Sequence, residues 1–176
     1  GRSHFSRFPL EENLVSPDGT VYERFEIHNY SYDPTMAPPG KTCLVTNFYT
    51  SKADYWIDHR KKNRTDYRAL KSEFLNKCAA IVCKKLDLLP EDIEVMDLST
   101  PATFHRYTGN WKGSTQGWLA GKNLLAPSPV KLRVPGLDNM FLCSHWNQPG
   151  GGLPIAIKTG RDLAMLLCKE NGVRFK

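Results

Sequence analysis

A glycine-rich turn between two apolar segments constrains this chain more than any other feature. The turn runs from Ser144 to Ile155 and reads Ser-His-Trp-Asn-Gln-Pro-Gly-Gly-Gly-Leu-Pro-Ile. Three glycines in a row let the backbone approach another group closely, because no side chain stands in the way. A helix that starts at Pro154 offers unpaired N–H groups and a partial positive charge. The pattern predicts a site for an anionic or electron-rich group; a flexible surface loop is the alternative for the glycines alone.

The first half of the chain predicts strands and one long helix. Residues 1–19 are expected to be irregular, whereas Val21–Tyr30 and Thr42–Tyr49 have the aromatic and β-branched content of strands. The segment between these strands holds three prolines and cannot be helix or central strand. Thr65 is expected to cap a helix that ends near Leu86. Its apolar residues recur at helical spacing and form one stripe: Tyr67, Leu70, Phe74, Cys78, Ile81 and Val82.

The second half predicts shorter elements. Ile93–Leu98 alternates apolar and acidic residues like a half-buried strand. Thr100 and Pro101 are typical of a helix start, and Gly109 of its end. A long loop follows over residues 110–129. Two further short strands and a widely apolar final helix, which is expected to be buried, complete the chain: residues 130–134, 139–143 and 154–171.

Composition indicates a cytoplasmic globular protein. The 176 residues are 40% hydrophobic and 24% charged, and no run reaches the roughly 18 apolar residues of a membrane span. The N-terminus lacks both a Met and an apolar segment, so it is not a signal peptide, and we expect further sequence before it. Five scattered cysteines favour reduced thiols over a disulfide framework. No histidine spacing predicts a metal site.

Much of the net charge of +6 lies between Lys52 and Lys71. The basic residues of this stretch outnumber its three aspartates, Asp54, Asp58 and Asp66. Five of the basic residues are Arg60, Lys61, Lys62, Arg64 and Arg68. Such a stretch is most often a solvated helix face. Peripheral contact with a membrane is the functional interpretation, and no nucleic-acid-binding motif accompanies the charges.

Three segments carry a resemblance to a known family. Val134–Arg161, which contains the turn, resembles the C-terminal signature of the phytoene desaturase, carotenoid isomerase and retinol saturase group of flavoproteins. His28–Lys41 is similar to the strand and loop of that family's substrate domain. Thr100–Gly109, with the glycines at 113 and 117, is similar to a helix and loop of the same domain. The three matches keep the family's order and cover roughly residues 20–170.

The resemblance implies an α/β flavoprotein, of which this portion is α+β. It would contain a substrate-domain sheet with helices, plus the C-terminal strand and helix of a Rossmann-like FAD-binding domain. After the irregular or truncated start at residues 1–19, residues 20–129 would belong to the substrate-binding domain. Residues 130–176 would be the last piece of the FAD-binding domain.

The resemblance also implies the site residues. FAD would be contacted by Ser144, His145, Gly150, Gly151, Gly152, Leu153, Pro154 and Ile155. Ser144 and Ile155 stand where the family usually has glycine, so their contacts depart from its pattern. The hydrophobic substrate would be met by His105, Tyr107, Lys112 and Trp118. No catalytic acid or base can be named.

The implied function is that of an FAD-dependent oxidoreductase acting on carbon–carbon bonds of a polyene or isoprenoid substrate, by desaturation, saturation or isomerisation. The G-x-G-x-x-G fingerprint that grips the dinucleotide is absent from the sequence, and in this family it lies at the N-terminus. The chain alone is therefore expected to bind FAD weakly or not at all and to need an N-terminal FAD-binding part. The alternative is a non-catalytic binding module for an apolar lipid. A serine hydrolase is disfavoured, because no nucleophile elbow is present.

Overall fold

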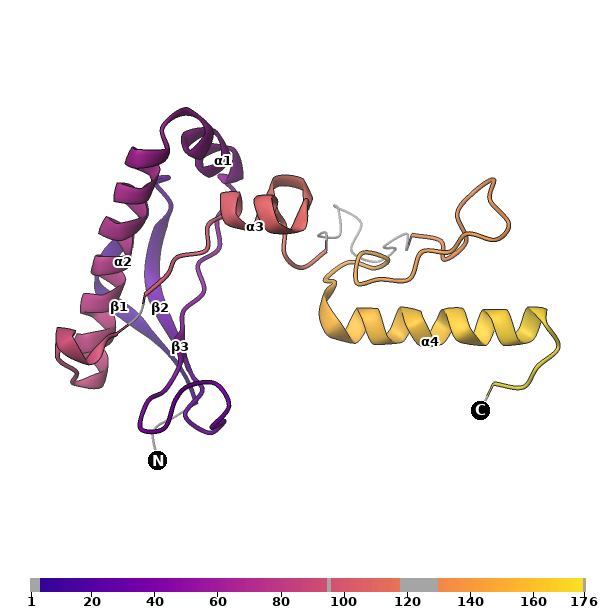
Figure 1. The fold of residues 1–176 in the computed structure, drawn as a ribbon, viewed down its shortest axis with the longest axis horizontal. Helices are drawn as coiled ribbons and strands as arrows, with labels where there is room; N and C mark the ends of the chain where they lie inside the picture. The colour runs from indigo at the N-terminus through magenta and orange to yellow at the C-terminus, as the bar shows by residue number, and fades with distance from the viewer. Residues whose placement is uncertain (1–3, 95, 118–129, 176) are drawn as a thin grey trace. The chain divides into compact units, whose positions relative to one another are not determined.

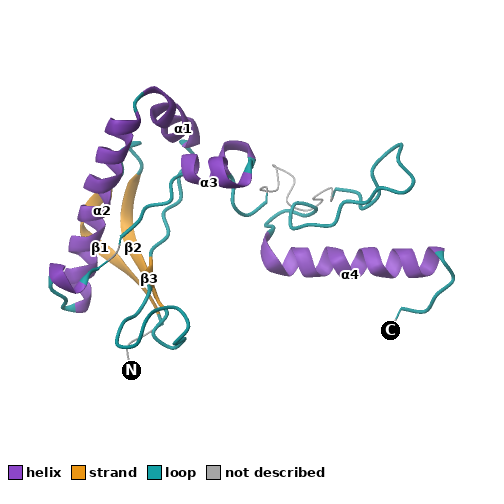
Figure 2. Cartoon of the chain, viewed as in Figure 1, coloured by secondary structure: helices purple, strands orange, loops and turns teal. Residues whose placement is uncertain are grey.

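The computed structural model describes residues 4–94, 96–117 and 130–175, which form two compact units. The first unit spans Gly1–Gly113 and the second Ser114–Lys176. Figures 1 and 2 show that the first unit combines a small sheet with helices, whereas the second is dominated by one long helix. The assignment of residues 20–129 and 130–176 to two family domains stays a prediction.

The sheet of the first unit is antiparallel and has the order β1-β2-β3. Its strands are β1 (Phe5–Val15), β2 (Val21–Asn29) and β3 (Leu44–Val45). The predicted strand at Val21–Tyr30 is confirmed. Only two residues of the predicted strand at Thr42–Tyr49 join the sheet. The predicted strand is therefore correctly located but longer than the observed one. The proline segment between β2 and β3 forms neither helix nor strand, as expected, and consists of turns and bends.

Strand β1 corrects the expectation that residues 1–19 are irregular. It pairs with β2 from Phe5 opposite His28 to Val15 opposite Val21, with a shift in register between Pro9 and Leu14. Proline is tolerated in an edge strand, where its missing N–H is not needed by a neighbour. The proline and the charged residues around it hid the strand, because the register shift interrupts the alternation that marks a strand in sequence.

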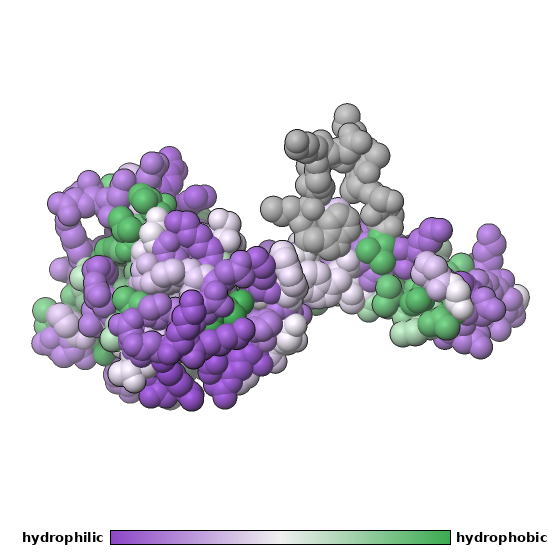
Figure 3. Space-filling model, turned by 90° about the horizontal axis from the view of Figure 1, so that it is seen from above, coloured by the Kyte–Doolittle hydropathy of each residue, from purple (hydrophilic) through white to green (hydrophobic). Residues whose placement is uncertain are grey.

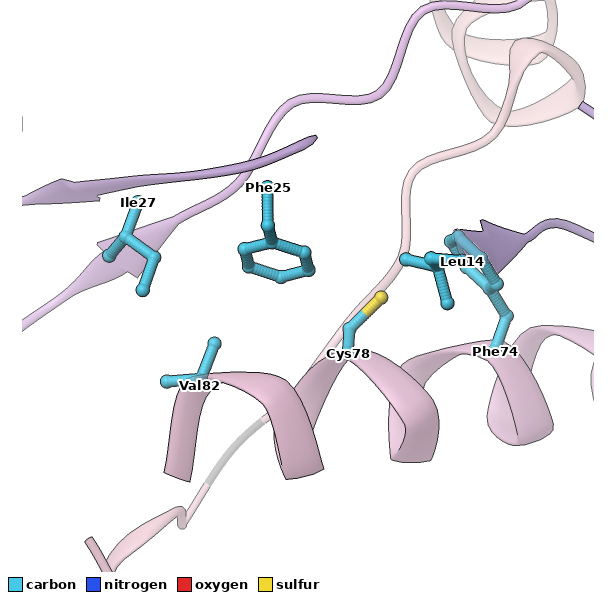
Figure 4. Packing of buried hydrophobic residues seen from close by; sticks show 6 residues of the cluster. All are labelled: Leu14, Phe25, Ile27, Phe74, Cys78 and Val82. Atoms are coloured by element: carbon cyan, nitrogen blue, oxygen red, sulfur yellow. The ribbon is translucent and has the colours of Figure 1, made fainter. Parts of the chain in front are cut away.

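Helix α2 (Arg64–Leu86) covers one face of the sheet, and the main core lies between them (Figure 4). Six buried residues form this core: Leu14, Phe25, Ile27, Phe74, Cys78 and Val82. The predicted stripe of α2 is confirmed, since Tyr67, Phe74, Cys78 and Val82 are its buried residues. Burial raises the pKa of the Cys78 thiol to about 12, because the apolar surroundings disfavour a thiolate.

The cap of α2 differs from the expected one. The predicted end at Leu86 is confirmed, but the Asn63 side chain accepts a hydrogen bond from the Asp66 N–H (3.1 Å) where Thr65 was expected to cap. A further helix, α1 (Ala53–Lys62), precedes this cap and carries part of the basic stretch. Asn63 can serve as the cap because α1 ends there in an extended conformation.

Helix α3 (Pro101–Thr108) is confirmed, and Gly109 ends it with a φ of 70°. A second cluster, made of Trp56, Tyr67 and Ala102, joins α1, α2 and α3. The Tyr67 hydroxyl also lies 2.7 Å from the Thr100 hydroxyl, which belongs to the capping residue of α3. The N-terminus of α3 is therefore anchored on both neighbouring helices.

A buried carboxylate ties the β1–β2 turn to α1. Asp18 is 7% exposed and accepts hydrogen bonds from the Thr20 N–H (2.9 Å), the Thr50 hydroxyl (2.7 Å) and the Trp56 indole N–H (2.8 Å). The Ser16 hydroxyl donates a fourth. Burial by itself raises the pKa of Asp18, but the hydrogen bonds from Ser16, Thr20 and Thr50 outweigh it and lower the pKa to about 2.

The predicted strand at Ile93–Leu98 is wrong. Residues 93–94 and 96–98 follow the short 3₁₀ helix η1 (Pro90–Asp92) without pairing to a strand. Glu94 pairs with Lys41 and Asp97 with Lys71, while Ile93 and Leu98 are half-buried. The alternation of apolar and acidic residues thus comes from an irregular segment that buries its apolar residues in part and pairs its acidic ones, and not from a strand in a sheet.

The second unit pairs a hairpin with α4 (Gly152–Glu170). Of the predicted strands at residues 130–134 and 139–143, a single antiparallel bridge between Arg133 and Phe141 forms, so the pairing is right but not the strand length. Helix α4 is confirmed, but the expectation that it is buried is wrong for this unit. Leu153 is 73% and Ile157 65% exposed, and Figure 3 shows apolar residues gathered on the part of this unit that faces the viewer.

The described residues form an antiparallel three-stranded sheet and four α-helices, which confirms the α+β expectation. The Rossmann-like component rests on the resemblance alone. No helix within the described ranges is long and apolar enough to cross a membrane.

Candidate functional site

The candidate site is the turn from Ser144 to Ile155, which lies entirely in the second unit. It connects the hairpin at residues 130–143 to the first turn of α4. The eight residues predicted to contact FAD are therefore brought together in one continuous segment. Its conformation depends on two buried polar side chains that were not among them.

Asn147 organises the first half of the turn. It is 2% exposed, and its amide donates a hydrogen bond to the Leu142 carbonyl (3.1 Å). Its Oδ1 atom accepts one from the Ser144 N–H (2.7 Å), and its carbonyl accepts one from the Val130 N–H (2.9 Å). Asn147 thus fixes both sides of the hairpin to the turn. The sequence signal for it is an asparagine three residues after a serine, a spacing that allows local side-chain-to-backbone bonds.

Thr159 joins the turn to the helix. It is 1% exposed, and its hydroxyl lies 2.9 Å from the Ile155 carbonyl and 3.2 Å from the Ser144 carbonyl. The Thr159 hydroxyl therefore links the α4 backbone to the first residue of the turn. Gly160 continues this contact, since a Cβ at that position would lie 3.7 Å from the Cys143 sulfur. Helix α4 packs on the hairpin through this small-residue face.

The three glycines have different roles. Gly151 is buried at a φ of 52°, and a Cβ there would lie 2.5 Å from the Gln116 carbonyl oxygen. The tight approach at Gly151 is thus to the chain itself. Gly150 has a φ of 84° with nothing within 4 Å of an added Cβ, and Gly152 has a φ of 77° with its nearest such neighbour at 3.7 Å. Gly150 and Gly152 leave the room that a close-lying ligand needs.

The first turn of α4 combines this room with N–H groups. The Gly152 N–H donates to Nδ1 of His145 (3.4 Å), so the His145 ring acts as a side-chain acceptor at the helix start. The next N–H group, of Leu153, lies in the first turn, where a helix supplies no backbone acceptor. Pro154 has no N–H, and the Ile155 N–H is the first whose helical acceptor, the Gly151 carbonyl, is present. The first turn holds no acidic residue, so the positive end of the helix dipole is not neutralised there.

The chemistry of this donor set fits an anionic or electron-rich group. Neutral N–H groups and a helix dipole stabilise negative charge, and the open glycines let that charge lie near the backbone. Among the described residues, no group of three or more His, Cys, Asp or Glu side chains is arranged to hold a metal ion. The turn contains a histidine, a serine and backbone donors, but no carboxylate.

Three of the predicted substrate residues lie in the first unit. His105 and Tyr107 are on α3, and Lys112 is in the 3₁₀ helix η2 (Trp111–Gly113). The His105 Nδ1–H donates to the Asn110 carbonyl (3.0 Å), Tyr107 is 76% exposed, and Lys112 pairs with Asp54. Trp118 lies outside the described residues. His105 and Tyr107 thus lie on α3 and Lys112 in η2, each with different neighbours, and their substrate role stays a prediction.

Comparison with known proteins gives two distant relatives. The chain is 24% identical over 157 residues to the 4,4'-diaponeurosporene oxygenase of Staphylococcus haemolyticus, which covers 88% of the chain and 29% of that protein. It is 29% identical over 132 residues to the all-trans-retinol 13,14-reductase of Danio rerio, which covers 68% of the chain and 22% of that protein. The chain thus spans less than a third of either relative. No family model and no solved structure matches it significantly.

Proposed function

We propose that the chain is the C-terminal portion of an FAD-dependent oxidoreductase that acts on carbon–carbon bonds of a hydrophobic polyene or isoprenoid. The observation that carries this proposal is the open glycine turn at the start of α4, which offers the Leu153 N–H group and the positive end of the helix dipole beside Gly150 and Gly152. This turn lies in the segment that carries the family resemblance. The names of the two relatives describe an oxygenase and a reductase, each of a polyene substrate.

When bound, FAD would supply the redox chemistry, a hydride transfer to or from the substrate. The residues of this chain would hold and orient the flavin. The Leu153 N–H group would face an electron-rich edge, and Gly150 and Gly152 would allow that edge to come close. Ser144 and His145 would contact the flavin's ribityl and pyrophosphate parts. Because His145 also accepts from Gly152, it would keep the first turn of α4 in place for the cofactor.

The rest of the cofactor site would come from residues outside this chain. A dinucleotide needs a phosphate-binding glycine loop, and this sequence has no G-x-G-x-x-G fingerprint. We therefore expect the chain alone to retain little or no FAD. His105, Tyr107 and Lys112 are proposed to lie on the substrate side, together with Trp118.

The alternative, a lipid-binding module without catalysis, has less support. A cavity of about 240 Å³ lies between the β1–β2 turn and α2. It is lined by Val15, Ser16, Pro17, Leu70, Glu73, Phe74 and Lys77. Binding pockets for small molecules usually enclose about 300–1,000 Å³. The cavity is therefore small for a polyene, and it carries an ion pair, Lys77 with Glu73 (2.7 Å), at its lining.

The test is to translate the reading frame that precedes residue 1 and to purify the longer protein. The proposal predicts a strand–G-x-G-x-x-G–helix unit in that frame and FAD bound to the purified protein in near-equal amount. The 176-residue chain by itself should contain little flavin. A frame without such a unit, together with a lipid bound in the absence of flavin, would favour the binding module instead.

A further inference from the structure

Asp18 uses its two carboxylate oxygens on two different parts of the first unit. Its Oδ1 atom accepts hydrogen bonds from the Ser16 hydroxyl and the Thr20 N–H (2.9 Å), which both belong to the β1–β2 turn. Its Oδ2 atom accepts from the Thr50 hydroxyl (2.7 Å) and the Trp56 indole N–H (2.8 Å). Thr50 lies just before α1 and Trp56 within it. One buried carboxylate therefore joins the turn of the sheet to α1. We call Asp18 and these four donors the Asp18 cluster.

The residues that lead into α1 are fixed by the same cluster. The Thr50 hydroxyl accepts a hydrogen bond from the Lys52 N–H (3.0 Å), and the Lys52 ammonium donates to the Asp18 carbonyl (3.0 Å). The Thr20 hydroxyl also lies 3.1 Å from the Thr50 hydroxyl. Because Lys52 immediately precedes α1, these bonds attach the start of the helix to the turn.

Helices α1, α3 and η2 contact one another at both ends of α3, and we call them the helical group (α1 and α3 in Figure 1). At the start of α3, Ala102 packs against α1 in the second buried cluster. A Cβ on Gly113 would lie 2.2 Å from the Pro101 carbonyl oxygen, so η2 folds back onto the start of α3. The Lys112 ammonium of η2 pairs with Asp54 of α1. A displacement of α1 would therefore move α3 and η2 with it.

The helical group carries the residues proposed for the substrate side. His105 and Tyr107 lie on α3, and Lys112 lies in η2. Lys112 has a φ of 51°, which a residue with a side chain keeps only where its surroundings impose it. The ion pair with Asp54 is one such constraint, and it comes from α1. The conformation of η2 thus depends on the position of α1, which the Asp18 cluster holds.

We propose that Asp18 is a positioning residue, which holds the helical group on the sheet and so sets the place of the substrate-side residues on α3 and η2. A buried carboxylate is costly unless it is hydrogen-bonded, so burial of Asp18 favours keeping Thr50 and Trp56 at the turn. The hydroxyl contact between Tyr67 and Thr100 (2.7 Å) adds an anchor from α2 to the start of α3. This role rests on the proposed function, to which the substrate side belongs.

Hydrogen exchange of the 176-residue chain tests the anchoring with two matched variants. Thr50→Val and Ser16→Ala each remove one hydroxyl that donates to Asp18, from its two opposite sides. Thr50→Val should make the amides of α3 and η2 exchange about fivefold faster or more, while amides in the middle of α2 keep their rates. Trp56→Phe, which keeps a ring but lacks the N–H, should act in the same way. Ser16→Ala should instead accelerate amides of the β1–β2 turn and leave α3 unchanged.

Three results would overturn the anchoring. Wild-type exchange rates in α3 of Thr50→Val would show that the Asp18 cluster does not hold the helical group. Equal acceleration in α2 and α3 would show a loss of overall stability in place of a local release. Equal acceleration of α3 by Ser16→Ala would show that the two oxygens do not hold separate parts.

The positioning role is tested in the longer protein by the binding of parinaric acid, a fluorescent conjugated tetraene. Thr50→Val should weaken this binding by about fivefold, and Ser16→Ala should retain it. The FAD content should stay the same in both variants, because the flavin-facing turn belongs to the second unit. Equal affinity of Thr50→Val and the wild type would overturn the positioning role. A wild type that does not bind parinaric acid would contradict the proposed function, whereas exchange in the 176-residue chain still decides whether Asp18 anchors the helical group.

Discussion

Nδ1 of His145 accepts a hydrogen bond from the backbone N–H of Gly152, so a ring seven residues earlier holds the start of α4. The Gly152 N–H belongs to the first turn, where no helix carbonyl can receive it. His145→Ala should therefore open this turn at a cost of about 1 kcal/mol. Hydrogen exchange of the Gly152 amide should become faster, while amides in the middle of α4 keep their rates. An unchanged Gly152 rate would show that the ring does not cap the helix.

Gly151 and Gly150 should respond differently to alanine. Both have a positive φ, which strains a residue that carries a side chain, so each substitution should cost stability. At Gly151 the new methyl would also lie 2.5 Å from the Gln116 carbonyl oxygen, whereas at Gly150 it meets nothing within 4 Å. Gly151→Ala should accordingly lower the free energy of unfolding of the second unit by more than Gly150→Ala does. Urea denaturation of the two variants checks this order, and equal losses would contradict the contact.

The elements that sequence predicts well are those whose pattern is local. Helix α2 has a regular apolar stripe, and α3 has both a proline start and a glycine end. Strand β1 escaped prediction because Pro9 and a register shift break its alternation, and its partner lies elsewhere in the chain. Burial of α4 could not be judged either, since the elements that would cover an apolar helix are not visible in its own sequence.

In the candidate site too, features that act locally were predictable and contacts with other segments were not. Glycine spacing and Pro154 located the turn, because they act through their own backbone. Asn147 and Thr159 hold it together, yet asparagine and threonine are mostly exposed in proteins, so nothing in the sequence marked these two as buried. Gly151 was grouped with the ligand-facing glycines, while its tight contact to Gln116 depends on a segment more than thirty residues earlier.

Asp18 should make the first unit sensitive to acid. Its pKa is lowered from 3.8 to about 2 in the folded protein, so the ionised carboxylate stabilises the fold above pH 4. This contribution, about 2 kcal/mol, is lost as the pH falls from 4 through 2. Urea denaturation between pH 6 and pH 2.5 should show the loss in the wild type. Asp18→Asn should be less stable at pH 6 and lack this part of the pH dependence.

Asp33→Asn is the matched control for Asp18, because Asp33 accepts similar turn hydrogen bonds from Thr35 but is not buried. It should leave the stability at pH 6 nearly unchanged. If Asp33→Asn and Asp18→Asn destabilise the chain equally, burial of Asp18 does not carry the effect.

Cysteine reactivity should separate the core from the surface. Cys78 is buried, and its pKa is raised to about 12, so almost no thiolate is present at pH 8. Cys143 is exposed at the end of the hairpin. A maleimide reagent at pH 8 should label Cys143 rapidly and Cys78 only after denaturation, as peptide mass analysis would show. Labelling of Cys78 at the rate of Cys143 in the folded protein would contradict the core packing.

The most direct test of the flavin-facing turn compares two glycines in the longer protein translated from the complete reading frame. Gly150 and Gly136 have φ values of 84° and 80°, and neither has an atom within 4 Å of an added Cβ. Gly150→Ala and Gly136→Ala therefore each place a methyl group in open space at a similar φ, and they differ in the proposed ligand contact. The measurement is FAD bound per protein, from flavin and protein absorbance. We expect Gly150→Ala to weaken FAD binding by about tenfold or more and Gly136→Ala to retain it. Equal FAD content in both variants and the wild type would contradict a flavin contact at this turn.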